Sequence, residues 1–152
     1  MKIAVCSDEH YSVNDFVVQE LERLGHKAIL FGSIKSHKDE SWVEATKEAA
    51  EAIKNGLCTE GIFFCWTGTG ASIVANKVAS IRAALCTDAQ TAKGARLWNN
   101  ANVLVLSNRL LTRDLAKEIL AAWFDSATLS KRNEDITSEI KKIEELNFSR
   151  KT

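Results

Sequence analysis

Five short apolar runs, each followed by a longer segment of helical period, constrain the fold of this chain more than any other feature. The runs are rich in β-branched and aromatic residues and lie at residues 3–6, 28–31, 61–66, 81–86 and 103–106. Parallel strands require crossover connections, which are usually helices. The alternation therefore predicts a three-layer α/β fold, in which helices cover both faces of a parallel, five-stranded sheet.

An α/β unit of this length commonly has the flavodoxin-like (Rossmann-like) strand order 2-1-3-4-5, or else a half-Rossmann order. We predict the first. In that order strands 1 and 3 are neighbours where the winding reverses, and ligands bind there, outside the carboxyl ends of the strands. Residues 7–10 and 65–72 should then face one another.

Local signals place the ends of the intervening helices. Capping-box patterns at residues 12–15, 41–44 and 87–90 mark three helix starts. Gly25 and Gly56 stand where the first two helices should stop, because a helix end favours a residue in the left-handed conformation. Each predicted start follows shortly after a predicted strand, as the alternation requires.

The charged tail at residues 133–151 has an apolar residue at every third or fourth position: Ile136, Ile140, Ile143 and Leu146. This spacing predicts a last amphipathic helix, docked on its own subunit or on a partner. The length of 152 residues, without a linker or an internal repeat, predicts a single domain over residues 1–152.

Charge and composition exclude several classes of function. Lys plus Arg and Asp plus Glu both number 20, so no basic excess is present to hold a nucleic-acid backbone or an anionic membrane. No apolar stretch approaches the roughly 18 residues of a membrane span, and no export signal is visible. We expect a soluble, cytoplasmic protein with neither a nucleic-acid partner nor a membrane partner.

The four cysteines are expected to be reduced thiols, because no export signal directs the chain to an oxidising compartment. None of them forms a C-x-x-C pair, and the three histidines lack metal-ligand spacing. We therefore predict no metal site.

The segment from Gly68 to Gly70 joins the third predicted strand to a helix, so free backbone N–H groups should point at whatever lies above Cys65. Such a turn can bind an anion. A nearby helix N-terminus can also make the thiolate of a cysteine available as a base or nucleophile. A tight turn beside an ordinary core cysteine would give the same residues.

Asp8, Glu9 and His10 leave the first strand together and bring two carboxylates and an imidazole to the same crevice. Helix capping and solvation would also explain them. The cluster of Asn99, Asn100 and Asn102 comes just before the fifth strand, which the predicted order puts at the far edge of the sheet. A role at the site of its own subunit is therefore not expected, whereas a role at a partner's site is possible.

Longer motifs point to a family. Residues 61–77 read Gly-Ile-Phe-Phe-Cys-Trp-Thr-Gly-Thr-Gly-Ala-Ser-Ile-Val-Ala-Asn-Lys, and Ile81-Arg82 and Asn99-Asn-Ala-Asn102 follow. Over roughly residues 1 to 125 the chain resembles the ribose-5-phosphate isomerase type B and galactose-6-phosphate isomerase family. The resemblance implies a flavodoxin-like homodimer or homotetramer that shares its sites between subunits. It also implies interconversion of an aldose phosphate and a ketose phosphate, such as ribose 5-phosphate and ribulose 5-phosphate, without a metal or cofactor.

The resemblance implies catalytic roles at matching positions. Cys65 matches the base that moves a proton between C1 and C2 through an enediolate, and Thr67 matches a threonine associated with opening of the sugar ring. Asp8 matches an aspartate that contacts the ring oxygen or a hydroxyl. Backbone amides that would hold the enediolate oxygen lie at Gly68, Thr69, Gly70 and Ser72.

Other matching positions would bind the substrate. Asn99 matches an asparagine from the neighbouring subunit, and Arg132 matches one of the arginines that grip phosphate. The family histidine after strand 1 is displaced by one residue, to His10. Trp66 replaces a glycine and should narrow or reshape the pocket. Trp98 replaces a histidine that assists ring opening, and an indole cannot act as a general base. The chain is thus expected to be a divergent branch of the family.

Two other classes of function stay open on the residues alone. A non-catalytic sugar-phosphate or nucleotide binding module would keep the anion site and lose turnover. A redox protein would use Cys65 as a reactive thiol, although no resolving cysteine lies nearby in the sequence. The joint presence of Cys65, Thr67 and Asn99 favours the isomerase.

Overall fold

The structure, a computed structural model, describes residues 1–148. Its strands are β1 (Lys2–Ser7), β2 (Lys27–Gly32), β3 (Glu60–Cys65), β4 (Ala83–Leu85) and β5 (Val103–Ser107). Its helices are α1 (Ser12–Arg23), α2 (Ser33–Ser36), α3 (Trp42–Lys54), α4 (Thr69–Ala75), α5 (Ala89–Asn99), α6 (Arg113–Trp123), α7 (Ser126–Leu129) and α8 (Asp135–Phe148). Strands and helices alternate as the sequence predicts, and the short helices α2 and α7 lie in the connections.

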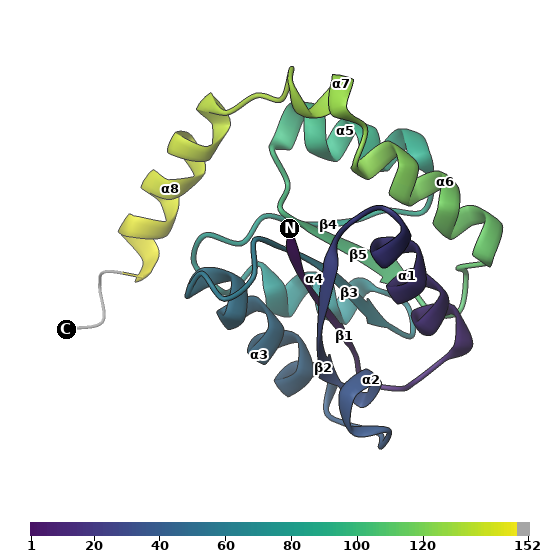
Figure 1. The fold of residues 1–152 in the computed structure, drawn as a ribbon. Coiled ribbons are helices and arrows are strands. Elements are labelled where there is room, and N and C mark those ends of the chain that lie inside the picture. The colour runs from purple at the N-terminus through teal and green to yellow at the C-terminus, as the bar shows by residue number, and fades with distance from the viewer. Residues whose placement is uncertain (149–152) are drawn as a thin grey trace.

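The strands are all parallel, and their order is β2-β1-β3-β5-β4 (Figure 1). The predicted flavodoxin-like class is confirmed, but the predicted order 2-1-3-4-5 is wrong for the last two strands. β5 pairs directly with β3, with Cys65 opposite Ser107, and β4 forms the edge. β5 is buried along its whole length, whereas β4 consists of three half-buried residues, so β5 takes the central position.

The right-handedness of parallel crossovers decides which helix covers which face. α1 leads from β1 to β2 and α5 leads from β4 to β5, in the same direction across the sheet, and both pack on one face together with α6. α3 and α4 make the connections in the opposite direction and pack on the other face. Figure 1 shows the resulting three layers.

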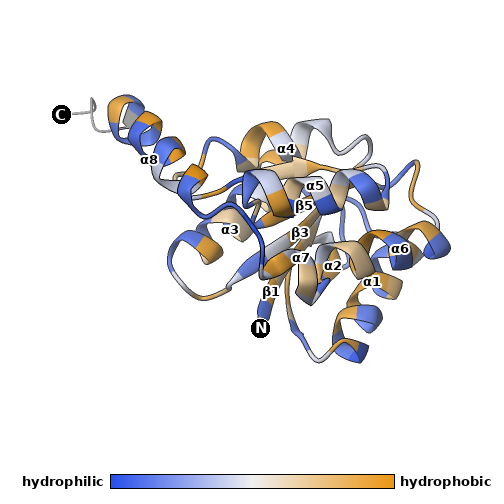
Figure 2. Ribbon diagram, turned by 90° about the horizontal axis from the view of Figure 1, so that it is seen from above, coloured by the Kyte–Doolittle hydropathy of each residue, from blue (hydrophilic) through white to orange (hydrophobic). Residues whose placement is uncertain are grey.

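Two apolar cores, separated by the sheet, hold these layers together. One contains Ile62, Phe64 and Leu104 beneath α1, α5 and α6, and the other contains Phe63 and Val105 beneath α3 and α4. Successive residues of β3 and β5 therefore point to opposite faces and are buried on both. Figure 2 shows these strands in the orange tones of apolar residues, between the helices.

The predicted helix starts are right in one case and displaced by one residue in two. Ser41 caps α3, where its Oγ accepts a first-turn N–H at 3.4 Å. α1 is capped at Tyr11, and α5 is capped at Asp88, whose carboxylate accepts a first-turn N–H at 2.7 Å. Gly25 and Gly56 end α1 and α3 as predicted, with φ of +83° and +78°.

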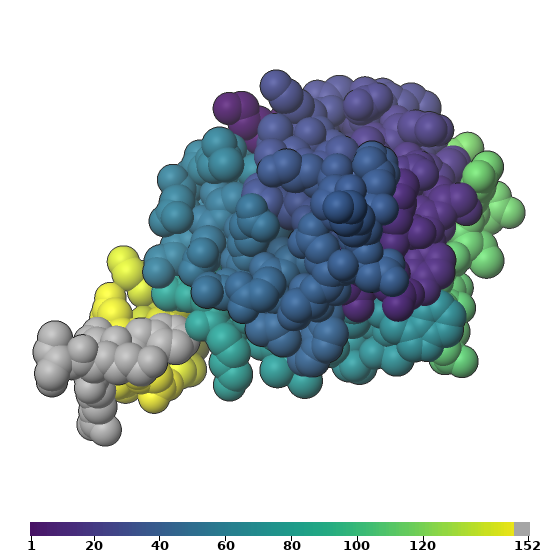
Figure 3. Space-filling model, turned by 90° about the horizontal axis from the view of Figure 1, so that it is seen from below, coloured from purple at the N-terminus to yellow at the C-terminus, as the bar shows by residue number. Residues whose placement is uncertain are grey.

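The predicted last amphipathic helix is α8, which projects from the body of the molecule (Figures 1 and 3). Two hydrogen bonds tie it to the body. The N–H of Ser80 donates to Glu144 Oε1 at 2.9 Å, and Asn100 Nδ2 donates to Thr137 Oγ1 at 2.8 Å. Ile143 on its apolar stripe is 59% exposed. The end of the predicted segment, after residue 148, lies outside the described residues.

Within residues 1–148, no helix combines the length and the apolarity that crossing a membrane requires. In the same part of the chain, no group of three or more His, Cys, Asp or Glu side chains is arranged to hold a metal ion.

A buried ion pair closes the amino-terminal end of the sheet. Arg96 of α5 is 1% exposed, and its Nη2 donates to Glu60 Oε1 at 2.8 Å. Its guanidinium lies 4.5 Å from the ring centroid of Trp123, and its Nη1 donates to the carbonyl of Ala101 at 2.5 Å. The indole N–H of Trp123 donates to the other carboxylate oxygen at 3.4 Å. The pair thus links β3, α5 and α6 inside the core.

We expect Glu60→Ala to lower the free energy of unfolding by about 3–5 kcal/mol, because removing one partner leaves the buried Arg96 cation uncompensated. Urea unfolding followed by circular dichroism measures this loss. Arg23→Ala is the control, since it breaks an ion pair with Glu20 at the surface, where the Arg23 side chain is 63% exposed, and should have a much smaller effect. Equal losses in the two variants would contradict the role assigned to the buried pair.

Candidate active site

The carboxyl ends of β1, β3 and β5 meet at one end of the sheet, and the loops that leave them lie side by side. β1 and β3 are neighbours, as predicted. The loop after β5 runs along the loop after β3, since the N–H groups of Asn108 and Arg109 donate to the carbonyls of Cys65 and Trp66 at 2.9 and 3.1 Å. Side chains from three separate parts of the sequence therefore converge here.

Cys65 is the last residue of β3, and it is 6% exposed. Its Sγ accepts a hydrogen bond from the backbone N–H of Gly68 at 3.1 Å. A donor in this position stabilises negative charge on the sulfur. Burial raises the pKa of each of the other cysteines, Cys6, Cys58 and Cys86, the last to about 12. Those three remain neutral thiols, and all four cysteines are free.

Two glycines let the chain pass from β3 into α4. Gly68 has a φ of +78°, and a Cβ at this position would lie 2.5 Å from Leu85 Cδ1. A Cβ on Gly70 would lie 2.9 Å from the ring of Trp42, whose indole covers this part of the helix. A larger residue at either position would shift the turn that holds Cys65 against its backbone donor.

The first turn of α4 supplies backbone donors for an anion, but fewer than predicted. The N–H of Gly68 is engaged by Cys65, and the N–H of Ser72 donates to the carbonyl of Gly68 at 3.1 Å. The donors that have no acceptor inside the helix are those of Thr69, Gly70 and Ala71. An anion at the predicted site would therefore be bound by three amides at the helix start.

Asp8 and Thr67 add polar side chains on the two sides of this turn. Thr67 Oγ1 lies 2.7 Å from Thr69 Oγ1, and both residues are exposed. Asp8 is half-buried, and its Oδ1 accepts the N–H of Glu9 at 3.0 Å. Burial raises the pKa of Asp8, while nearby backbone N–H groups oppose the rise. The site therefore combines hydroxyl groups with a carboxyl that holds its proton to a higher pH than usual.

Aromatic side chains lie over the same loops. Trp66 is 53% exposed, and its ring centroid lies 6.0 Å from that of Tyr11. The hydroxyl of Tyr11 donates to the carboxylate of Glu9, and this bond raises the pKa of Tyr11 to about 12. Trp42 is 44% exposed and packs on Gly70. Bulky side chains therefore stand on three of the segments around the turn that follows Cys65.

Most predicted site residues come together at this end of the sheet, namely Asp8, His10, Cys65, Trp66, Thr67, Gly68, Thr69, Gly70 and Ser72. Among these residues, His10 is also held against the start of α1, because its Nε2 lies 2.7 Å from Asp15 Oδ1.

Trp98, Asn99 and Arg132 lie elsewhere, at the amino-terminal end of the sheet. α5 ends at Asn99, and Arg132 follows α7. The neighbouring Asn102 accepts the N–H of Gly61 at the start of β3, about 13 Å along the strand from Cys65. The asparagine cluster is thus remote from Cys65, as predicted, but the predicted reason, a fifth strand at the far edge of the sheet, is wrong. β5 is central, and the cluster is separated from Cys65 along the strands rather than across the sheet.

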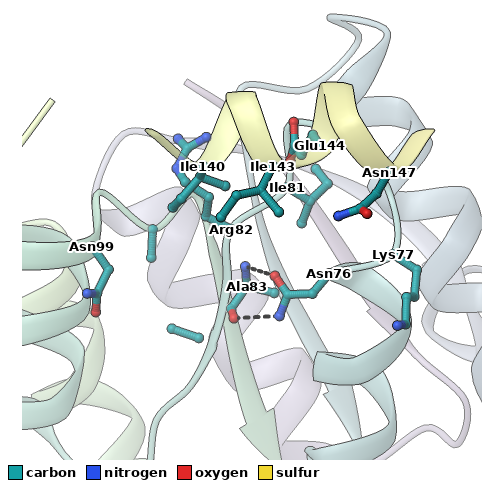
Figure 4. A pocket seen from close by; sticks show the side chains of 12 residues that line it. Asn76, Lys77, Ile81, Arg82, Ala83, Asn99, Ile140, Ile143, Glu144 and Asn147 are labelled. Atoms are coloured by element: carbon teal, nitrogen blue, oxygen red, sulfur yellow. Dashed lines mark hydrogen bonds between the residues drawn. The ribbon is translucent and has the colours of Figure 1, made fainter. Parts of the chain in front are cut away.

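A cavity of about 550 Å³ lies between α8 and the body, beside Asn99 and away from Cys65 (Figure 4). Figure 4 shows Ile140 and Ile143 of α8 over Arg82. Its one acidic lining residue, Glu144, already accepts a backbone N–H at 2.9 Å. The thiol of Cys65 and the carboxyl of Asp8, the side chains predicted to take part in proton transfer, do not line this cavity.

The sequence reasoning missed the residues after β5. Ser107 Oγ donates to the carbonyl of Trp66 at 2.8 Å, and Asn108 and Arg109 follow it along the Cys65 loop. The error came from the strand order, which put the fifth strand at the far edge. The uninterrupted Val-Leu-Val-Leu run of residues 103–106 was the available signal, since such runs are typical of central parallel strands.

The sequence matches the family described as Ribose/Galactose Isomerase over residues 3–143. The chain belongs to this family. Ribose-5-phosphate isomerase B of Escherichia coli is 31% identical over 140 residues, which cover 92% of this chain and 93% of that protein. D-erythrulose-4-phosphate isomerase of Pectobacterium atrosepticum is 52% identical over 77 residues, 51% of each chain. The solved structure of Clostridium thermocellum ribose-5-phosphate isomerase B superposes with a TM-score of 0.84 at 34% identity, covering 97% of this chain and 99% of that chain.

Membership in the Ribose/Galactose Isomerase family confirms the predicted family and the predicted reaction class, an aldose–ketose isomerase acting on a sugar phosphate. The alignment with the erythrulose phosphate enzyme spans about half of that protein, whereas the alignments with the type B isomerases extend over nearly the whole of them. The roles of individual residues stay predictions.

Asp8→Asn should stabilise the folded chain at neutral pH. Because burial raises the pKa of Asp8, its contribution to stability is complete below the ordinary value of 3.8 and is lost as the pH rises through the raised pKa. The variant lacks this titration, so its gain in the free energy of unfolding should appear at pH 7 and vanish near pH 3. Urea unfolding at both pH values measures it. A gain of the same size at both would contradict the direction of the pKa shift.

Proposed function

We propose that this protein interconverts an aldose phosphate and a ketose phosphate with Cys65 as the base. One observation carries the proposal. Cys65 Sγ lies at the carboxyl end of the central strand β3, 3.1 Å from a backbone donor. The N–H groups of Thr69, Gly70 and Ala71, which have no acceptor inside α4, follow on the same turn. A base beside an oxyanion site is what proton transfer through an enediolate requires.

The reaction needs two coupled proton transfers. The Cys65 thiolate removes the proton from the carbon next to the carbonyl, and the C–H electron pair becomes the second bond between C1 and C2. The carbonyl oxygen takes up the negative charge and is stabilised by the N–H groups at the start of α4. The thiol then returns the proton to the neighbouring carbon, and a hydroxyl proton moves from one oxygen to the other. Thr67 and Asp8 serve this second transfer, and no oxidant or reductant is consumed.

The substrate we propose is a four-carbon sugar phosphate, with D-erythrulose 4-phosphate as the ketose. A relative with 52% identity over 77 residues is named for that substrate. Trp66 and Tyr11 contact each other on the loops that follow β3 and β1, and two such large side chains at the predicted site favour a substrate with a short carbon chain. A four-carbon sugar phosphorylated on O4 has no hydroxyl left to close a furanose ring. Such a substrate needs no ring opening, so Trp98 in place of a histidine removes nothing that the reaction uses.

We also propose that the active form is a homodimer or a homotetramer with shared sites. Trp98, Asn99 and Arg132 lie too far from their own Cys65 to act there, and a neighbouring subunit could bring them to it. Among residues 1–148, Arg132 Nε is buried without a hydrogen-bond partner and lies 3.7 Å from Glu134 Oε1, which is compatible with a binding role. Arg109, exposed on the loop beside Trp66, is the candidate phosphate ligand within the same subunit.

The proposal is tested by NMR with four-, five- and six-carbon aldose and ketose phosphates. We expect turnover of erythrulose 4-phosphate, with kcat/KM at least roughly tenfold above that for ribose 5-phosphate. Cys65→Ala should still bind the substrate but lose about 10²–10⁴-fold in kcat. Saturable binding without turnover by the wild-type protein would instead favour the non-catalytic binding module.

Trp66→Gly should shift the preference toward five-carbon sugar phosphates, because it removes the indole beside Cys65. The measurement is the ratio of kcat/KM for ribose 5-phosphate to that for erythrulose 4-phosphate, which we expect to rise about 10-fold or more. Leu57→Ala is the matched control, since Leu57 is equally exposed (53%) but follows α3 at the other end of the sheet. An unchanged ratio in Trp66→Gly would remove Trp66 from the account of specificity.

A further inference from the structure

Three buried polar side chains form a hydrogen-bonded row beneath the site. Asn14 in the first turn of α1 donates from Nδ2 to Asn108 Oδ1 at 2.9 Å, and Asn108 Nδ2 donates to Ser7 Oγ at 3.0 Å. Asn14 and Ser7 are fully buried, and Asn108 is 8% exposed. A buried network of this kind, with its groups paired, favours one arrangement of the elements that carry it.

One end of the row holds the loop that carries Asp8. The hydroxyl of Ser7 donates to the carbonyl of Glu9 at 2.5 Å, so the residues on both sides of Asp8 are joined to each other. Asn14 Oδ1 accepts the N–H of Tyr11 at 2.8 Å, which fixes the exit of the same loop into α1. The backbone around Asp8 therefore depends on Asn108 through Ser7 and Asn14.

The other end of the row holds the loop that carries Cys65. The N–H of Asn108 donates to the carbonyl of Cys65 at 2.9 Å. The residues before and after it, Ser107 and Arg109, both donate to the carbonyl of Trp66, at 2.8 and 3.1 Å. Asn108 is thus bonded by its backbone to the Cys65 side of the site and by its side chain to the Asp8 side.

We propose that Asn108 is a positioning residue of the isomerase, which sets the separation between the Asp8 carboxyl and the Cys65 thiol without contacting the substrate. This inference rests on the proposed function. The position needs a side chain that accepts from Asn14 and donates to Ser7 at the same time, and an amide does both. A carboxylate could only accept. The Ser7 hydroxyl would then turn toward it and release the carbonyl of Glu9.

The test is Asn108→Asp, which keeps the size of the side chain and the bond from Asn14 but cannot donate to Ser7. We expect kcat to fall about 10- to 100-fold with KM changed less than about threefold, because the groups that bind substrate are kept and only their alignment is lost. Ser7→Ala removes the same link from the other side with a smaller change. The double variant should be no slower than the slower single variant, since both break one connection.

Thr128→Ala is the control for a merely structural effect. It removes a buried hydroxyl that donates to Asp125 at 2.7 Å in α7, far from Cys65, and it should lower stability without lowering kcat. If the wild-type protein turns over no sugar phosphate, the proposed function fails and this inference with it. If the wild-type protein is active and both Asn108→Asp and Ser7→Ala keep its kcat, the inference alone is overturned.

Discussion

The pairing of β3 with β1 on one side and β5 on the other is the constraint on which the rest of this structure depends. It buries β3 on both faces and brings the last residue of that strand, Cys65, to the point where three loops meet. The turn after Cys65 then has to be tight, and the φ of +78° at Gly68 satisfies this need. The same turn directs the N–H of Gly68 toward Cys65 Sγ and leads into α4 at the next residue. Chemistry at this site is therefore a consequence of how the sheet is built.

Much of this arrangement could be predicted from the sequence, because it depends on local patterns. The apolar runs located every strand, and the reversal of winding between strands 1 and 3 placed Asp8 and Cys65 together. The order of the last two strands could not be read in the same way, since it depends on which strand is buried more deeply. The Ala-Ala-Leu of β4 and the Val-Leu-Val-Leu of β5 carry that information only as a difference in bulk. The error hid Asn108 and Arg109, which lie beside Cys65 only when β5 is central.

The tryptophans show how a shared reaction can be adapted to a different substrate. The groups proposed for proton transfer and oxyanion binding lie on β3 and on the turn after it, where a Cβ on Gly68 or Gly70 would meet close contacts. Trp66 and Trp42 lie on the outer side of those turns, where a change of bulk alters the space for substrate and leaves the turn intact. The four-carbon substrate proposed above cannot form a ring, which would account for the absence of a histidine at position 98. In the proposed function, specificity and catalysis would thus depend on different side chains around one turn.

Isotope exchange shows whether Cys65 is the group that moves the proton. The protein is incubated with erythrulose 4-phosphate in deuterated water. NMR then follows the entry of deuterium at C1, for the wild-type protein and for Cys65→Ser. We expect exchange by the wild-type protein and a loss of about 10²-fold or more in Cys65→Ser. The serine has a similar size and can keep the hydrogen bond from Gly68, but its hydroxyl is a far weaker base than a thiolate. Exchange by Cys65→Ser at the wild-type rate would show that another group removes the proton and would contradict the account.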